Sequence, residues 1–162
     1  VSQLAQKCGV SINEVKNVTV WGNHSCMQYP DLHHASVKGQ NALSLIDTDW
    51  FVNEFMPTVQ YRGGEVIKVR GQSSAGSAAN AALKHMATWI HGTADGDWVS
   101  MAVPSDGSYG IEPGLVFSFP VTVSDGQYHI VRGLDLNEFS LDWLHKNQAE
   151  LIEERQMVKH LR

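Results

Sequence analysis

The chain has 162 residues, of which 43% are hydrophobic and 18% are charged, and its net charge is −5. This length indicates one domain that can bury a core of its own, and the composition excludes a disordered chain. The acidic balance argues against a nucleic-acid partner. No apolar run approaches the roughly 20 residues that a membrane-spanning helix needs, so we do not expect a membrane partner either.

The first half of the chain is predicted to hold helices around a short strand. Residues 1–6 form a helical face without an N-cap residue ahead of it, which suggests that the chain begins inside a helix. Residues 18–21 are rich in β-formers and predict a strand, followed by a polar loop. Asp47 or Thr48 can cap the next helix, and we expect Arg62-Gly63-Gly64 to break it.

The strongest helical pattern covers Ala75–His91, where alanines and larger apolar residues recur at a helical period. Ser73 or Ser74 can cap this helix, and Gly92 follows its end. The alanine-rich face lets another backbone approach closely, which fits either ordinary core packing or a helix–helix contact between subunits. The serines ahead of the helix fit either simple capping or an anion site at the helix N-terminus.

The second half is predicted to contain a strand at residues 98–103 and a hairpin of strands at 115–123 and 128–131, joined by an Asp-Gly turn. Pro120 cannot donate a ladder hydrogen bond, so we expect its strand to lie at a sheet edge or to have a bulge there. A long helix is predicted over residues 141–161. Because helices and strands do not alternate regularly, the pattern favours an α+β fold with antiparallel strands and packed helices over a doubly wound parallel sheet.

Common nucleotide-binding, metal-binding and serine-hydrolase motifs are absent from the sequence. It has no GxGxxG, GxxxxGK[ST], HExxH or GxSxG segment, and Cys8 and Cys26 form no CxxC pair, so we expect no metal site. The spacing of most histidines does not suit a metal, and we interpret them as structural or surface residues. These histidines are His33, His34, His85, His91, His129, His145 and His160.

His24 differs from the other histidines because it lies in a loop directly after a predicted strand, where catalytic groups are commonly carried. Imidazole can give or take a proton near neutral pH, so His24 is a candidate general acid or base. The alternative is a histidine that hydrogen-bonds its own loop. The neighbouring Ser25 also permits a Ser–His nucleophile, although no nucleophile-elbow motif supports a hydrolase.

Several segments match one protein family in order along nearly the whole chain. They are NVTVWGNHS at 17–25, QYPD at 28–31, RGGEVIK at 62–68, SSAGSAA at 73–79, GT at 92–93, VSM at 99–101, SDG at 105–107 and SFPV at 118–121. Together they resemble the C-terminal, substrate-binding domain of malate dehydrogenases, closest to the cytosolic type, in the lactate/malate dehydrogenase family. The agreement of several separate segments makes the resemblance specific.

The resemblance implies that residues 1–162 form one substrate-binding and dimerisation domain, with the helix at 75–91 in a homodimer interface. It implies that His24 is the catalytic residue, which takes the proton from the malate hydroxyl as hydride passes to NAD and returns it in the reverse direction. The matching positions are Gly63, Ser73 and Ser74 on the substrate side, and Asn23 and Ser74 on the cofactor side.

The family's nucleotide-binding half has no counterpart in this sequence. The same holds for the Asp that orients the catalytic histidine and for the arginines that hold the substrate carboxylates. We therefore expect NAD to be bound mainly by a missing N-terminal domain and this chain alone to be inactive. A related lactate or other 2-hydroxyacid dehydrogenase and a non-catalytic association module remain the alternatives. The cytosolic-type match favours a cytoplasmic location, with a mitochondrial or other organelle as the alternative.

Overall fold

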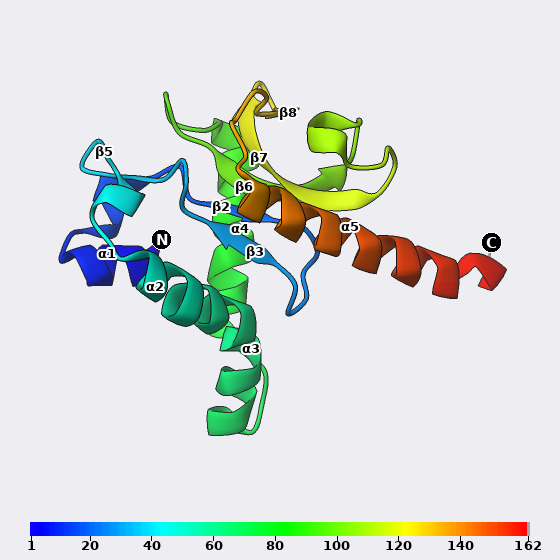
Figure 1. Cartoon of the computed structure of the whole chain (residues 1–162), viewed down its shortest axis with the longest axis horizontal. Coiled ribbons are helices and arrows are strands. Elements are labelled where there is room, and N and C mark those ends of the chain that lie inside the picture. Colours follow the sequence, from blue (N-terminus) through cyan, green and yellow to red (C-terminus); the bar gives the residue numbers. More distant parts are fainter. Residues whose placement is uncertain (162) are drawn as a thin grey trace.

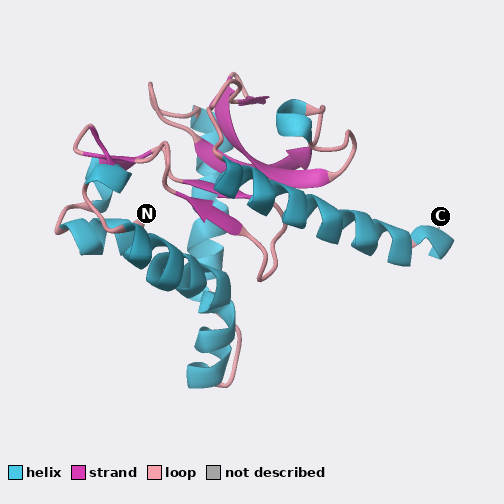
Figure 2. Cartoon of the chain, viewed as in Figure 1, coloured by secondary structure: helices cyan, strands magenta, loops and turns pink. Residues whose placement is uncertain are grey.

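The computed structural model describes residues 1–161 and has an α+β fold in which every strand pairing of these residues is antiparallel (Figures 1 and 2). The predicted fold class is therefore confirmed. The helices are α1 (Ser2–Cys8), η1 (Ile12–Glu14), η2 (Ala42–Ser44), α2 (Thr48–Trp50), η3 (Phe51–Phe55), α3 (Met56–Arg70), α4 (Gly76–His91), η4 (Ser108–Gly110), α5 (Glu138–Met157) and η5 (Lys159–Leu161). The strands are β1 (Val15–Lys16), β2 (Thr19–Trp21), β3 (Tyr29–Asp31), β4 (Ser36–Val37), β5 (Gln40–Asn41), β6 (Val99–Pro104), β7 (Val116–Ser124) and β8 (Gln127–Ile130).

The centre of the fold joins the sheet β6-β7-β8 to the hairpin β2-β3. The junction is at Gly22, directly after β2. Its N–H donates to the Ser118 carbonyl over 3.2 Å, and the Ser118 N–H donates to the Gly22 carbonyl over 2.9 Å. The Ser118 hydroxyl also donates to the Val20 carbonyl at 2.6 Å. The end of β2 is thus held against β7, the middle strand of the sheet.

The core fills the space between this junction and α5, which crosses in front of β7 in Figure 1. Trp21 is fully buried and makes edge contacts with Tyr109 and Phe119, at ring-centroid distances of 4.9 and 6.3 Å. Leu144 supplies a fully buried side chain from α5. Because large apolar groups here are removed from water, the end of β2 lies in the hydrophobic core.

The predicted break at Arg62-Gly63-Gly64 is wrong, because α3 continues through these residues to Arg70. A glycine in a helix interior costs about 1 kcal/mol relative to alanine but does not forbid helical geometry. The helix instead ends at Gly71, whose φ of 70° is left-handed and whose N–H donates to the Ile67 carbonyl over 2.7 Å.

Pro120 is not in an edge strand, because β7 pairs with β6 on one side and β8 on the other. The carbonyl of Pro120 accepts from the Val131 N–H at 2.9 Å, just past the end of β8. In an antiparallel strand the nitrogen and carbonyl of one residue face the same neighbour. The missing N–H of Pro120 therefore faces the end of the β7–β8 ladder, where its loss is tolerated.

Two helix starts also differ from their predicted positions. The N-cap of α4 is Ala75, which makes no side-chain capping hydrogen bond, so neither Ser73 nor Ser74 caps this helix. In α5 the cap is Asn137, whose side chain accepts from the Ser140 N–H, and the helix begins at Glu138 rather than at residue 141. A cap depends on the turn that leads into the helix, which the helical period does not reveal.

Helix α4 has no buried residue within this chain. Residues 76–87 are exposed, and only Thr88 and Trp89 near its end are half-buried. The Trp89 Nε1–H donates to the Gly126 carbonyl at 2.8 Å, which ties the end of the helix to the turn between β7 and β8. Packing of the alanine-rich face into this chain's own core is therefore wrong. Among residues 1–161, no helix has both the length and the apolar character required to cross a membrane.

Candidate functional site

His24 lies at a hollow of about 380 Å³ between the β2–β3 loop and helix α3. The loop contributes His24 and Gln28, and α3 contributes Gln60, Tyr61 and Gly63 among other residues. The structure thus brings together His24 and Gly63, which are 39 residues apart in sequence. The hollow is open to solvent and falls within the size range of small-molecule sites.

The imidazole of His24 is exposed and has no hydrogen-bond partner among residues 1–161. It is therefore not tied to its own loop, which argues against the structural alternative for this histidine. An exposed imidazole at the rim of a hollow is free to exchange a proton with a bound small molecule.

Helix α5 binds the His24 loop through side-chain hydrogen bonds. The side-chain amide of Asn23 donates to Glu150 Oε2 at 3.0 Å and to Glu154 Oε1 at 2.8 Å, so this side chain faces α5. The Ser25 hydroxyl donates to Glu150 Oε2 at 2.7 Å. Its proton is directed to a carboxylate rather than to His24, and this geometry does not support the Ser–His nucleophile.

The α3 side of the hollow is tied to the loop and includes two residues that have no side chain. The Gln60 side-chain amide donates to the Gln28 carbonyl at 2.9 Å, which links α3 to the loop. Gly63 and Gly64 are exposed, and a Cβ added at either would have no heavy atom within 4 Å. The two glycines therefore leave open space beside His24.

Ser73 and Ser74 lie in the segment between α3 and α4 and are not among the residues that line the hollow. The Ser73 carbonyl accepts from Arg70 Nη1 at 3.4 Å. Of the predicted substrate-side residues, this chain places only Gly63 beside His24. The roles of the serines stay predictions.

A buried polar network supports the strand that follows the His24 loop. The Asp31 carboxylate, 2% exposed, accepts from Trp21 Nε1 at 3.0 Å and from His33 Nδ1 at 2.6 Å. Tyr29 contacts Asp31 at 3.2 Å and Ser140 of α5 at 2.9 Å through its hydroxyl. His33 thus has the structural role predicted for it.

Two groups of this network, Asp31 and Tyr29, have pKa values shifted from their ordinary values. Burial would raise the pKa of Asp31, but hydrogen bonds from the His33 side chain and backbone and from Trp21 outweigh it and hold the pKa below its ordinary value. Burial, followed by the nearby Asp31 charge, raises the pKa of Tyr29. Tyr29 is therefore a neutral hydrogen-bonding group and Asp31 an anion at neutral pH.

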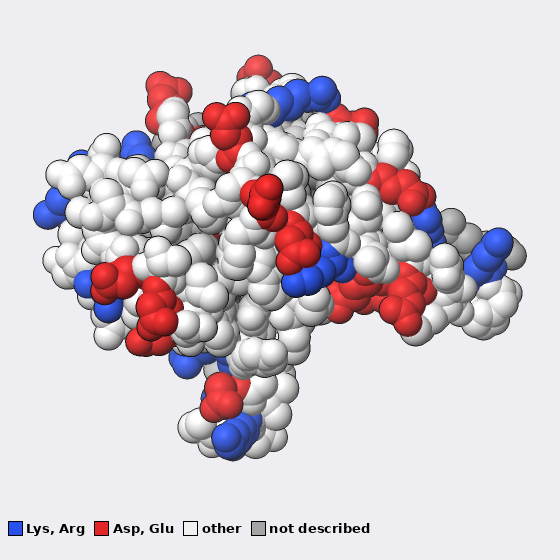
Figure 3. Space-filling view, viewed as in Figure 1, with Lys and Arg blue, Asp and Glu red and all other residues white. Residues whose placement is uncertain are grey.

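The residues that sequence reasoning missed are Asn147, Glu150 and Glu154, the α5 groups that contact the His24 loop. Their spacing places them along one face of the helix, and this is the one sequence signal that could have marked them. Figure 3 shows acidic side chains over α5, while basic side chains are scattered over the same view. The contacts themselves depend on which loop lies across the helix.

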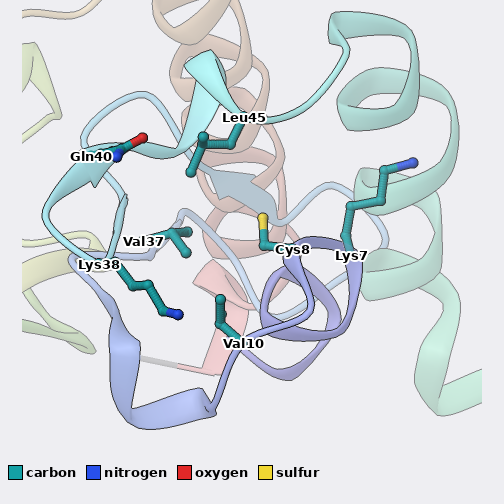
Figure 4. A pocket seen from close by; sticks show the side chains of 7 residues that line it. All are labelled: Lys7, Cys8, Val10, Val37, Lys38, Gln40 and Leu45. Carbon is teal, nitrogen blue, oxygen red and sulfur yellow. The ribbon is translucent and has the colours of Figure 1, made fainter.

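A second hollow, of about 410 Å³, lies between α1 and the β4–β5 hairpin (Figure 4). Its two cations already interact within the chain. Lys38 Nζ is 3.5 Å from Glu14 Oε1, and Lys7 Nζ lies 5.1 Å from the Trp50 ring centroid, which fits its direction away from the hollow in Figure 4. Residues 1–161 contain no cluster of three or more His, Cys, Asp or Glu able to hold a metal.

Comparison with known proteins gives one family. The model of the lactate/malate dehydrogenase alpha/beta C-terminal domain matches residues 1–161. The chain is 47% identical to malate dehydrogenase from Naegleria fowleri, with a TM-score of 0.92 over 99% of this chain and 49% of that protein. It is 34% identical to Trichomonas vaginalis lactate dehydrogenase in complex with NADH and oxamate, with a TM-score of 0.92 over 99% and 51%. A Plasmodium falciparum malate dehydrogenase at 22% identity shares the fold, with a TM-score of 0.82 over 99% and 51%. The chain spans about half the length of these proteins.

Proposed function

Because the chain belongs to the lactate/malate dehydrogenase family, we propose that it is the C-terminal, substrate-binding domain of an NAD-dependent malate dehydrogenase that interconverts malate and oxaloacetate. The observation that carries this proposal is the exposed His24 imidazole at a hollow that Gly63 also lines, with open space where a Gly63 side chain would lie. A small 2-hydroxy acid would lie between them, with its hydroxyl toward the imidazole.

In this proposal His24 moves the proton. Its imidazole accepts the proton of the malate C2 hydroxyl, and in the reverse direction its protonated form donates to the oxaloacetate carbonyl oxygen. NAD supplies the acceptor for the hydride that leaves C2. The hollow suits the substrate, whereas residues 1–161 offer neither a parallel sheet nor a glycine-rich turn for a dinucleotide. NAD would therefore be held mainly by residues outside this chain.

Malate is preferred over lactate in this proposal because identity to the Naegleria malate dehydrogenase is 47% and identity to the Trichomonas lactate dehydrogenase is 34%. A lactate or other 2-hydroxyacid dehydrogenase is the second candidate, supported by the equal TM-scores of 0.92. The two substrates differ by one carboxylate, so a cation near the far end of the substrate would decide between them.

We also propose a homodimer through α4. In this chain Leu83, Met86 and Ile90 are 71%, 55% and 69% exposed on a helix with no buried residue. Exposed apolar groups on one element are typical of a subunit contact. The cytosolic-type resemblance supports a cytoplasmic location. A non-catalytic association module would use the same helix without the His24 chemistry.

The experiment follows NADH oxidation by the full-length protein with oxaloacetate and with pyruvate. We expect turnover with oxaloacetate, a loss of about a hundredfold or more in His24→Gln, and no turnover by the isolated 162-residue chain. His145→Gln is the matched control, because His145 is exposed on α5. Preference for pyruvate would favour the lactate alternative, and an active His24→Gln variant would contradict the proposed role of His24. Sedimentation of the full-length protein tests the dimer, and dimerisation without turnover would favour the association module.

A further inference from the structure

We propose that Asn147 is a positioning residue for His24. Its side chain fixes both ends of the His24 loop against helix α5. The catalytic consequence of this inference rests on the proposed function, whereas the structural part does not. The evidence is the set of hydrogen bonds made by the buried Asn147 side-chain amide. It binds Asn23 and Met27, and His24 lies between these two residues in sequence.

The Asn147 side chain is 0% exposed and bonds on both sides. Its Oδ1 accepts from the Asn23 N–H at 2.9 Å, directly before His24. Its Nδ2 donates to the Met27 carbonyl at 2.6 Å and to the Trp143 carbonyl at 2.9 Å. Both amide hydrogens are thus used, and one of them closes the far end of the loop.

Gly22 makes this approach possible. Its φ is 94°, and a Cβ built on it would lie 2.0 Å from Asn147 Oδ1, so no side chain fits between the loop and the amide. The backbone of Gly22 is also bonded to Ser118 of β7. The residue at the start of the loop is therefore held between the sheet and α5. The close contact with Asn147 and the left-handed φ each favour glycine directly after β2, because glycine has no Cβ.

The chemistry of the clamp requires an amide. A side chain at this position must accept from the Asn23 N–H and donate to the Met27 carbonyl, and the Asn side chain provides one group of each kind. A carboxylate would place a second acceptor against two carbonyls, and an alanine would leave the half-buried Asn23 N–H and Met27 carbonyl without this partner. Glu150 is half-buried and Glu154 is exposed, whereas Asn147 is fully buried, so water screens the Glu150 and Glu154 bonds more strongly.

The matched control is the next residue on the same helix. Gln148 has the same functional group, but its Oε1 accepts from the Glu112 N–H at 2.6 Å, far from the His24 loop in sequence. Replacing Gln148 with alanine removes a side-chain amide from α5 and a hydrogen bond to a backbone N–H. It leaves the contacts of Asn23 and Met27 in place.

The first measurement is hydrogen exchange of peptides that cover residues 21–29 in the full-length protein. We expect Asn147→Ala to speed exchange in this loop about tenfold, because a hydrogen bond to the fully buried Asn147 amide is lost on each side of His24. We expect Gln148→Ala to leave the loop unchanged. In the dehydrogenase assay Asn147→Ala should lower kcat by about a hundredfold through misplacement of the imidazole, with a much smaller change in KM for oxaloacetate.

The second variant is Asn147→Asp, whose outcome depends on pH. When the new carboxyl group is protonated it can accept from Asn23 and donate to Met27, as the amide does, and when ionised it cannot donate. We expect kcat relative to wild type to rise as pH falls in Asn147→Asp and to stay level in Asn147→Ala. The titratable neighbours on both sides, Glu150 on α5 and His24 on the loop, are present in both variants, so Asn147→Ala is the reference against which the pH dependence of Asn147→Asp is compared.

The inference is overturned if Asn147→Ala leaves loop exchange and kcat within twofold of Gln148→Ala, or if Asn147→Asp shows no recovery at low pH. Should Asn147→Ala fail to fold, loop exchange in Asn147→Asp at low and high pH decides the same question. If the wild-type protein proves to have no dehydrogenase activity, the proposed function fails, and loop exchange still decides whether Asn147 fixes the loop.

Discussion

Replacing Gly63 with alanine should stabilise the chain. Gly63 lies in the interior of α3, is exposed, and would place its new Cβ where no heavy atom lies within 4 Å. The substitution therefore gains helix propensity without a clash, which amounts to about 1 kcal/mol. For a domain of this size, that free energy corresponds to a rise of about 2–4 °C in Tm. Thermal unfolding of the 162-residue chain, followed by circular dichroism, measures it.

Gly71→Ala is the control that tests the effect of backbone conformation on the same glycine-to-alanine change. A Cβ at Gly71 also has no heavy atom within 4 Å, but the φ of this residue is 70°, at the left-handed end of α3. The same chemical change should therefore lower the free energy of unfolding by about 1 kcal/mol, because an L-residue is strained in this conformation. A lower Tm for Gly63→Ala, or a higher one for Gly71→Ala, would refute the reasoning.

Gly63→Ala should also reduce the dehydrogenase activity of the full-length protein. Gly63 lines the hollow beside His24, so an added methyl group takes up space that the proposed substrate needs. A variant that unfolds at a higher temperature and turns over more slowly would indicate that the glycine serves the site at the expense of the helix. A more stable variant with full activity would show that the substrate does not approach this wall.

Three further outcomes follow from the buried groups around the loop. The bonds from His33 and Trp21 hold the pKa of Asp31 low, so its contribution to stability is complete above the ordinary carboxyl pKa and is lost as pH falls through the lower folded-state pKa. Urea unfolding of Asp31→Asn at a series of pH values should lack this acid-dependent loss. Leu144→Ala should cost about 2–5 kcal/mol in the same assay, because Leu144 is 0% exposed, and His145→Ala should cost almost nothing. Trp21→Phe removes the Nε1 donor to Asp31 and should cost more than its lost contacts alone.

The elements that sequence reasoning predicted well depend on local signals. The hairpin of β7 and β8 was predictable because alternating apolar residues flank an Asp-Gly turn, and its register pairs Ser124 with Gln127 around that turn. Helices α4 and α5 followed from their apolar period, whereas the full length of α3 did not. Gly63 and Gly64 misled because glycine lowers the helical preference by an amount that neighbouring residues can outweigh. Pro120 misled because its tolerance depends on where the neighbouring strand ends, which is not a local property.

The residues of the candidate site also differ in whether a local signal or family resemblance could identify them. His24 was identified by its place after a strand and by family resemblance, and Gly63 by resemblance alone. Asn147 has neither of these signals, and its helical spacing with Glu150 and Glu154 does not reveal its burial, since a polar residue in an amphipathic helix is ordinarily exposed. Its burial follows from Gly22, 125 residues earlier in the chain, which brings the loop backbone onto the helix. A contact of that sequence separation requires the assembled fold.

Helix α4 should open in a graded way, because it is attached to the rest of the chain near one end. Trp89 is bonded to the β7–β8 turn, whereas residues 76–87 are exposed on every side. In the isolated chain, amide protons should exchange fastest in the first turns and slowest around Trp89, since helices without tertiary packing are marginal at this length. Covering the helix would abolish that gradient, so the pattern of protection along α4 reports whether its surface is occupied.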